Sequence, residues 1–249
     1  MRYKEELRES RVRHLLKGMI TRREALAPAI IFGLLAFGLY IFLAIADEVA
    51  EGEIREFDEW LLLLFRNSAD PSIVWGPAWL QEAMVEFTAL GGYPVIILTL
   101  VVVLGLLLIT RRYGPALFTF VSVWFGWLIS HMLKQLYDRP RPDLVNHLDT
   151  VHTASFPSGH AMMSTVIYLT LAALVVRFFQ DFRVRVYVLV VAVLVSALVG
   201  ISRIVLGVHW PSDVIAGWAL GIAWACFLWL AVAFLQRSSK RQSGDPRDL

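Results

Sequence analysis

Three short segments of the chain carry side chains that bind anions or transfer protons. In chain order they are residues 134–142, 156–160 and 202–213, and each combines basic residues or histidine with serine, glycine or aspartate. Arginine and lysine bind multi-oxygen anions such as phosphate, and a histidine beside a carboxylate can act as a nucleophile. These segments therefore predict the binding and transfer of a phosphoryl group.

Five residues of these segments are expected to hold the phosphate oxygens. Lys134, Arg141 and Arg203 provide the cations, because arginine offers planar paired donors and lysine a compact charge. Ser158 and Gly159 precede an apolar run, where serine can cap a helix and glycine lets backbone N–H groups approach an anion. We expect the phosphate to meet both side-chain cations and a helix N-terminus.

His209, Asp213 and His160 are the residues expected to be catalytic. His209 and Asp213 are four positions apart with Pro211 between them, which indicates a helix start that brings the carboxylate to the imidazole. That contact fixes the tautomer of His209 and raises its basicity. His160 supplies a second imidazole for proton transfer, and two such histidines suffice for phosphoryl transfer without a metal. We therefore expect no metal and no cofactor.

Each of these residues also has a purely structural interpretation. Lys134 could be a lysine that snorkels from a helix end, Arg203 could pair with Asp213, and His160 could be an interfacial histidine. Arg139 lies in the same basic run as Arg141, but we do not expect it to contact substrate. Trp210 is interpreted as a membrane-interface side chain. Only the joint pattern favours the catalytic interpretation.

The elements that must position these residues are membrane-spanning helices. The chain is 57% hydrophobic and 18% charged with a mean hydropathy of +0.62, whereas a soluble domain carries about 25% charged residues. Continuous apolar runs predict helices rather than strands. The six predicted spans are residues 26–46, 89–110, 115–133, 160–179, 186–205 and 214–235. The prediction is an all-α, six-span bundle forming a single domain, 1–249.

Charges in the short loops predict the orientation of the bundle. Basic residues cluster in the polar N-terminus (1–25), at 111–112, at 177–185 and in the tail (237–249), and these four segments fall on one side. The positive-inside rule makes that side cytoplasmic. Two passes between His160 and Ser202 return the chain to the side that it left, which is the side opposite the basic segments. The chemistry-bearing segments, 134–213, are therefore expected together on the outer face.

The segment 47–88 is acidic and is expected on the outer face. Its apolar residues recur at helical spacing and predict an amphipathic helix on the membrane surface; they are Ile54, Phe57, Leu61, Leu64 and Phe65, with Arg55, Asp58, Glu59 and Arg66 among the polar positions. This helix could gate or support lipid substrates, or it could simply pack on the bundle. Gly217 and Gly221 in the sixth predicted span indicate close helix packing.

The order and spacing of the motifs resemble the three-part signature of the type 2 phosphatidic acid phosphatase family. The matching residues are Lys134 with Arg141-Pro142, then Pro157-Ser158-Gly159-His160, then Ser202-Arg203 with His209 and Asp213. The resemblance implies that His209 attacks phosphorus, forming a phosphohistidine, that Asp213 orients it and that His160 protonates the leaving oxygen. It also implies that Lys134, Arg141, Ser158, Gly159 and Arg203 hold the phosphate, and that no divalent metal takes part.

The function expected from this resemblance is that of a lipid phosphatase of the phosphatidylglycerophosphatase B or undecaprenyl pyrophosphate phosphatase type, in the bacterial inner membrane. Its substrate is expected to enter from the bilayer; undecaprenyl pyrophosphate is the first choice, with phosphatidylglycerol phosphate, phosphatidic acid and lipid A phosphates as alternatives. A lipid phosphotransferase with an acceptor such as lipid A is a second hypothesis. A transporter or non-catalytic scaffold is a third. No nucleic-acid partner is expected, and the oligomeric state stays open.

Overall fold

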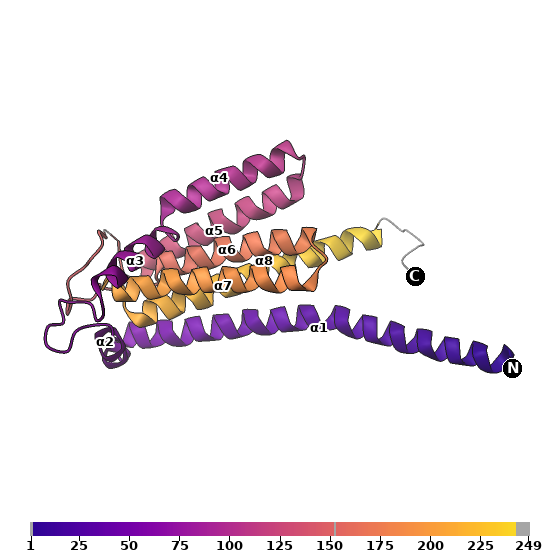
Figure 1. The fold of residues 1–249 in the computed structure, drawn as a ribbon, viewed down its shortest axis with the longest axis horizontal. Helices are drawn as coiled ribbons and strands as arrows, with labels where there is room; N and C mark the ends of the chain where they lie inside the picture. Colours follow the sequence, from indigo (N-terminus) through magenta and orange to yellow (C-terminus); the bar gives the residue numbers. More distant parts are fainter. Residues whose placement is uncertain (1, 152, 243–249) are drawn as a thin grey trace.

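The structure, a computed structural model, describes the backbone of residues 2–151 and 153–242. Within these ranges it consists of helices and contains no strand apart from an isolated bridge between Arg66 and Val74 (Figure 1). The helices are α1 (Arg2–Glu51), α2 (Arg55–Leu63), α3 (Ala78–Ala89), α4 (Tyr93–Ile109), α5 (Tyr113–Tyr137), α6 (Gly159–Phe178), α7 (Phe182–Val205) and α8 (Pro211–Gln242). The all-α prediction is confirmed.

Five of the described helical stretches are long and apolar enough to cross a bilayer. They are Leu26–Glu51 of α1, the whole of α5, α6 and α7, and Pro211–Gln236 of α8. Helices α3 and α4 provide the sixth span when they are taken as one span bent by 44°. The six predicted spans are thus present, but the second is broken and begins earlier than its predicted start at Ala89.

The break between α3 and α4 is made possible by glycine. A Cβ atom at Gly91 would lie 2.4 Å from Val199 Cγ1 and 3.2 Å from the carbonyl oxygen of His160. Both distances are shorter than a van der Waals contact, so the turn can approach α6 and α7 only without a side chain. Pro94 then stands in the first turn of α4, where its missing N–H leaves no helical bond unmade.

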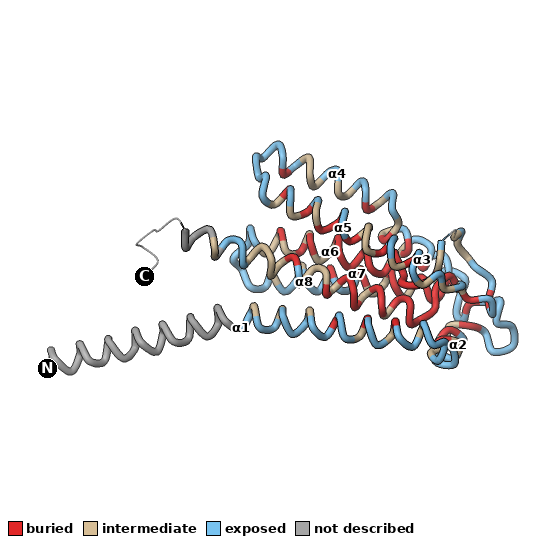
Figure 2. Tube along the Cα trace, turned by 180° about the vertical axis from the view of Figure 1, so that it is seen from behind, coloured by how far each residue is buried: buried red, intermediate tan, exposed pale blue. Residues whose placement is uncertain are grey.

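Helices α6, α7 and α8 form the centre of the bundle, where Figure 2 shows most of the buried residues. Helix α1 packs along α8, and α4 packs on α5 at the opposite side. Close approach of α6 and α8 depends on small residues, as predicted: a Cβ at Gly217 would lie 2.7 Å from Ser158 O, and one at Gly221 2.8 Å from Thr165 Cβ. The N-terminal ends of α6 and α8 are thereby brought into contact.

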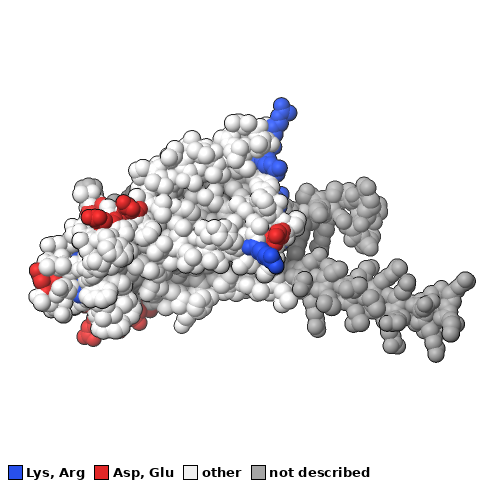
Figure 3. All heavy atoms as spheres, in the orientation of Figure 1, with Lys and Arg blue, Asp and Glu red and all other residues white. Residues whose placement is uncertain are grey.

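Acidic and basic side chains separate along the bundle. On the face drawn in Figure 3, most acidic side chains gather at the end that carries α2 and α3, and basic side chains gather at the other end. Helix α1 begins and α8 ends at this second end (Figure 1). The side chains of the predicted polar N-terminus (1–25) and most of the predicted tail (237–249) lie outside the described residues.

The predicted outer segment contains α2 and α3, but two of its predicted polar positions do not face water. Asp58 and Arg66 are buried, whereas Phe57 and Leu64 are 42% and 56% exposed. Helix α2 therefore turns Asp58 and Leu62 toward the bundle, while other apolar side chains such as Phe57 face away from it. The physical reason is that Asp58 has polar partners inside the protein, which compensate for its removal from water.

Candidate active site

The residues predicted to bind phosphate and to catalyse its transfer gather at one end of the bundle. Lys134 lies in the last turn of α5 and Arg203 in the last turn of α7, while Asp213 lies in the first turn of α8. Ser158 and Gly159 begin α6, and His209 stands in the link between α7 and α8. Four helix ends thus position these side chains, which favours precise geometry.

Local features of the chain end α5 and begin α6. Asp138 adopts the left-handed conformation (φ 38°) directly after α5, and Pro140 and Pro142 prevent the helix from continuing. The chain returns to α6 at Ser158, whose Oγ accepts a hydrogen bond from Ala161 N at 3.4 Å. This agrees with the predicted helix cap. The N–H of Ser158 donates to Asp213 O at 2.9 Å, which joins α6 to α8.

His209 lies between a carboxylate and a guanidinium. Its Nδ1 is 3.3 Å from Asp213 Oδ2, as the spacing predicted, and its Nε2 is 3.3 Å from Arg141 Nη1. Because a guanidinium can only donate, Nε2 must be the acceptor and Nδ1 must carry the proton given to Asp213. The lone pair of Nε2 is thus on the side of the cations. Burial lowers the pKa of His209 well below its usual range, and Arg141 lowers it further, so the imidazole is neutral at pH 7.

The carboxylate of Asp213 is fully buried and fully bonded. Besides His209, it accepts hydrogen bonds from Trp210 N at 2.9 Å, from Arg139 Nη1 at 2.6 Å and from Ser155 Oγ. The interpretation of Trp210 as an interface side chain is wrong, because this residue is buried and its Nε1 donates to Pro140 O at 3.0 Å. Ser155 was not predicted, since no motif in the sequence marks it.

Lys134 and Arg141 have neutral partners. Lys134 Nζ donates to Ala154 O at 2.6 Å, and Arg141 Nε donates to Thr153 O at 2.9 Å and its Nη1 to Val208 O. Burial, followed by the charge of Arg203, lowers the pKa of Arg141 to about 10, so it stays protonated at neutral pH. Backbone carbonyls satisfy donors without cancelling charge. Both cations therefore keep a net positive charge that an anion can neutralise.

Arg203 has a charged partner, although not the one considered from the sequence. Its Nη1 bonds to Asp149 Oδ2 at 2.5 Å and to Thr88 Oγ1 at 2.8 Å, and it does not pair with Asp213. Asp149 belongs to the loop between α5 and α6, and its side chain is 34% exposed. Burial by itself would raise the pKa of Asp149, but the bond from Arg203 lowers it on balance. The carboxylate of Asp149 thus occupies the position on Arg203 where another anion could bind.

His160 lies in the first turn of α6, against the turn between α3 and α4. Its ring carbon Cδ2 is 3.4 Å from the Cβ position at Gly91, and it is close enough to Arg203 and Asp149 to experience their charges. It is therefore at the site, on the side of the cations. Among the residues that the structure describes, no three His, Cys, Asp or Glu side chains gather as a metal ion would require.

Arg139 and Asp58 take part in the site in a way that was not predicted from the sequence. Arg139 bonds Asp213 and Asp58. The expectation that it does not contact substrate stays a prediction. Asp58 was assigned only to the outer segment, yet its partners belong to the site. The spacing of 81 residues between Arg139 and Asp58 gives no local signal from which their pairing could be predicted.

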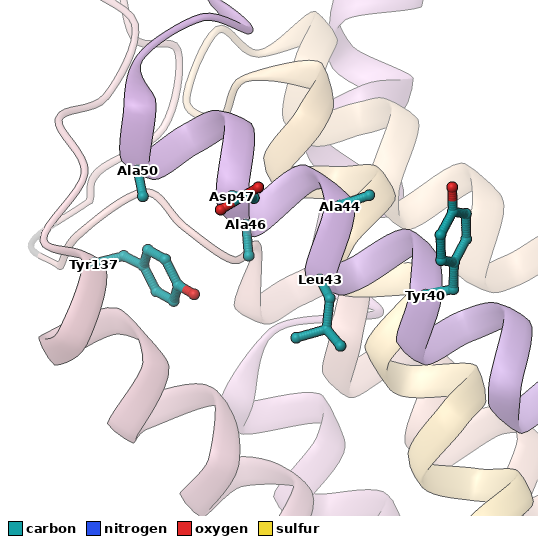
Figure 4. A pocket seen from close by; sticks show the side chains of 7 residues that line it. All are labelled: Tyr40, Leu43, Ala44, Ala46, Asp47, Ala50 and Tyr137. Atoms are coloured by element: carbon teal, nitrogen blue, oxygen red, sulfur yellow. The ribbon is translucent and has the colours of Figure 1, made fainter.

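An open groove borders the site between α1 and α5. It has a volume of about 460 Å³ and is lined by Tyr40, Leu43, Ala44, Ala46, Asp47, Ala50 and Tyr137 (Figure 4). The ring of Tyr137 packs edge-on against Phe156, 4.9 Å between centroids, and Phe156 directly follows Ser155 in the chain. The groove thus touches the site through these two rings, but it contains none of the predicted catalytic or phosphate-binding residues.

Comparison with known proteins gives the class of this fold and site. The PAP2 superfamily profile matches residues 115–237, a range that includes every predicted site residue. Phosphatidylglycerophosphatase B of Bacillus subtilis is 30% identical over 187 residues, covering 73% of this chain and 86% of that protein. Decaprenylphosphoryl-5-phosphoribose phosphatase of Mycobacterium tuberculosis is 31% identical over 141 residues, covering 55% and 73%.

Solved structures agree with this likeness. The crystal structure of a transmembrane PAP2 type phosphatidylglycerolphosphate phosphatase from Bacillus subtilis matches with a TM-score of 0.66 and 25% identity, over 83% of this chain and 96% of that one. LpxE of Aquifex aeolicus matches with a TM-score of 0.53 and 25% identity, over 68% and 92%. The chain belongs to the PAP2 superfamily. It is a multi-pass membrane phosphatase of lipid phosphates.

Proposed function

We propose that this protein hydrolyses the phosphomonoester or pyrophosphate group of a membrane lipid through a phosphohistidine formed at His209. The observation that carries the proposal is the geometry of this histidine, with Nδ1 at Asp213 and Nε2 at Arg141. A neutral imidazole whose free nitrogen points to a cationic group is prepared to attack phosphorus. The attack needs no divalent metal, because Lys134, Arg141 and Arg203 supply the positive charge.

Binding begins with an exchange of partners. The phosphate oxygens replace the backbone carbonyls on Lys134 and Arg141 and the carboxylate of Asp149 on Arg203. Gly159 offers its backbone N–H group and the positive end of α6 to the same anion, and Ser158 offers its hydroxyl, because the N–H of Ser158 is already bonded to Asp213 O. A phosphate bound in this way has its phosphorus facing His209 Nε2.

The reaction has two steps. In the first, the lone pair of Nε2 forms a bond to phosphorus, the bond from phosphorus to the lipid oxygen breaks, and His160 donates a proton to that oxygen. Asp213 stabilises the positive charge on the imidazole through Nδ1–H. In the second, His160 accepts a proton from water, the water oxygen bonds to phosphorus, and the bond to Nε2 breaks. The products are inorganic phosphate and neutral His209.

Relatives of the chain support an order of substrates. Phosphatidylglycerol phosphate comes first, because phosphatidylglycerophosphatase B is similar over 73% of this chain. Undecaprenyl pyrophosphate comes next, since the Undecaprenyl-diphosphatase of Sulfolobus acidocaldarius is 38% identical over 30% of the chain. The lipid enters from the bilayer, with its head group among the cations at the end of the bundle. This order differs from the one expected from the sequence, where undecaprenyl pyrophosphate was first.

The orientation proposed from the sequence is that both termini are cytoplasmic and that the site faces outward in the bacterial inner membrane. The link between α4 and α5, which contains Arg111, and the start of α7, which contains Arg183, support it, because they lie at the end of the bundle opposite α2 and α3 (Figure 1). Proteolysis of sealed, right-side-out spheroplasts tests it. Cleavage in the loop 64–77 of intact spheroplasts is expected, and cleavage only after lysis would contradict it.

A second candidate is the removal of phosphate from lipid A. The Lipid A 1-phosphatase of Rhizobium johnstonii is 33% identical over 120 residues, which is 45% of this chain and 45% of that protein. The same phosphohistidine would serve either lipid. A lipid phosphotransferase would also form this intermediate, but would pass the phosphate to a lipid hydroxyl instead of water.

The test is phosphate release by the purified protein in detergent, with a chelator present, from a panel of these lipids. We expect release that persists in the chelator and that falls about 10³-fold or more in His209→Ala. Loss of activity on chelation would contradict the metal-independent mechanism. Labelled phosphate that appears in a second lipid instead of in water would identify a phosphotransferase. Equal release from His209→Ala and the wild type would reject the proposed nucleophile.

A further inference from the structure

Asp58 is a fully buried carboxylate that comes from outside the part of the chain matched by the family profile. It lies on α2, more than fifty residues before residue 115, where the match begins. A buried carboxylate is unfavourable unless its oxygens are bonded. Asp58 Oδ2 accepts from Arg139 Nη2 at 2.7 Å and from Ser212 Oγ at 2.5 Å, and Oδ1 accepts from Ser212 N at 2.8 Å. The bonds that compensate for the burial of Asp58 thus all come from residues at the site.

The guanidinium of Arg139 joins this carboxylate to the proposed catalytic one. Its Nη2 bonds Asp58 while its Nη1 bonds Asp213 Oδ1 at 2.6 Å and Ser212 Oγ at 2.8 Å. The Arg139 side chain is 12% exposed, and both carboxylates are 0% exposed. A planar guanidinium with two carboxylates on its two nitrogens has little freedom to turn. The oxygen of Asp213 that faces away from His209 is held in a fixed position.

Asp58 also holds the helix that carries Asp213. Ser212 is the second residue of α8, and its N–H is one of those that no residue within the helix can satisfy. The bond from this N–H to Asp58 gives α8 a cap supplied by α2, and the negative charge lies at the positive end of the helix dipole. The first turn of α8 and the side chain of Asp213 are therefore fixed by one carboxylate.

We propose that Asp58 and Arg139 are positioning residues for phosphoryl transfer, which hold Asp213 so that its Oδ2 stays on Nδ1 of His209. This inference rests on the proposed function of His209. Helix α2 then belongs to the catalytic apparatus and does not act as a gate that opens during each turnover. Neither residue contacts the phosphate, so both act on the chemical step and leave phosphate binding to the three cations.

The direct test replaces Asp58 by asparagine, which keeps the shape and removes the charge. Glu59→Gln is the matched control, because Glu59 is the next residue on α2, its side chain is 32% exposed and its partner is Arg55. The assay uses the lipid phosphate on which the wild-type protein is most active. We expect Asp58→Asn to lower kcat by about 10- to 100-fold through loss of alignment, with KM changed less than about threefold. Glu59→Gln should match the wild type.

A pH profile separates positioning from a loss of structure. The charged groups that face His209 are Arg141, Lys134, Arg203, His160 and Asp213, with Arg139 and Asp58 beyond Asp213. Removing the negative charge of Asp58 makes protonation of His209 less favourable. The acid limb of kcat/KM is therefore expected to move to lower pH in Asp58→Asn and to stay in place in Glu59→Gln.

Two further measurements keep the test decisive if Asp58→Asn is unstable. Ser212→Ala removes a hydroxyl that bonds both Asp58 and Arg139 while it keeps the N–H cap, and its kcat should fall about threefold to tenfold. Binding of inorganic phosphate, followed by calorimetry, should be equal in the wild type and in Asp58→Asn. Unchanged kcat in both variants, or loss of phosphate binding together with kcat, would overturn the positioning role. Inactivity of the wild type on every lipid would instead reject the proposed function, and the positioning role with it.

Discussion

The two sides of His209 are built differently. On the Nε2 side, Lys134 and Arg141 bond to backbone carbonyls and Arg203 bonds to a partly exposed carboxylate. On the Nδ1 side, Asp213 takes part in a closed set of buried charges. Partners of the first kind can be exchanged for a substrate anion, whereas breaking the second leaves buried charges unpaired. The difference indicates that one side binds and the other aligns.

Removing Arg139 should give the largest effect, because it opens the closed side. Arg139→Met leaves Asp58 and Asp213 buried without a cation. We expect a loss of about 3–5 kcal/mol in the free energy of unfolding and phosphate release near background. Thermal unfolding in detergent together with the phosphate assay measures both. A stable, active Arg139→Met protein would mean that the two sides do not differ in this way.

Removing Arg141 should lower activity strongly with little effect on stability, because its partners are neutral. Arg141→Gln is expected to lower kcat/KM by about 10²-fold, as for the loss of one donor to a developing oxyanion. The unfolding temperature should stay within a few degrees of the wild type. A large drop in that temperature would show that Arg141 serves the structure as much as Arg139 does.

The pH dependence of kcat/KM gives a smaller but more specific test. Burial lowers the pKa of His209 below its ordinary value of 6.5, and the neighbouring Arg141 lowers it further. The nucleophile must be neutral, so activity should persist as the pH falls through 6.5 and decline only at more acidic values. In Arg141→Gln, the loss of a positive charge should move this decline to higher pH. A wild-type limb at or above 6.5 would contradict the account.

The smallest effect is expected at Asp149, which must leave Arg203 when phosphate binds. Asp149→Asn removes the competing charge, so KM should fall about fivefold, which corresponds to an ion pair worth about 1 kcal/mol at a partly exposed position. Steady-state kinetics and the inhibition constant of inorganic phosphate both report this change. A higher KM would indicate that Asp149 helps to bind the lipid and does not compete with it.

Much of the exchangeable side could be predicted from the sequence, because its residues stand at helix ends. Apolar runs indicated which of these ends share a face. On the closed side, the four-residue spacing of His209 and Asp213 predicted their contact. The rest of the closed side could not be predicted, since Asp58 and Arg139 are 81 residues apart and their pairing depends on how α2 folds back onto α8. The break at Gly91 was also missed, because the apolar character continues across it.

Trapping the intermediate on His209 tests the central claim most directly. The wild-type protein is mixed with a lipid carrying labelled phosphate and quenched in alkali, where phosphohistidine survives, and the labelled peptide is identified by mass spectrometry. The account predicts label on His209 in the wild type and none in His209→Ala. Label on another residue, or turnover in the wild type without any labelled His209, would contradict the account.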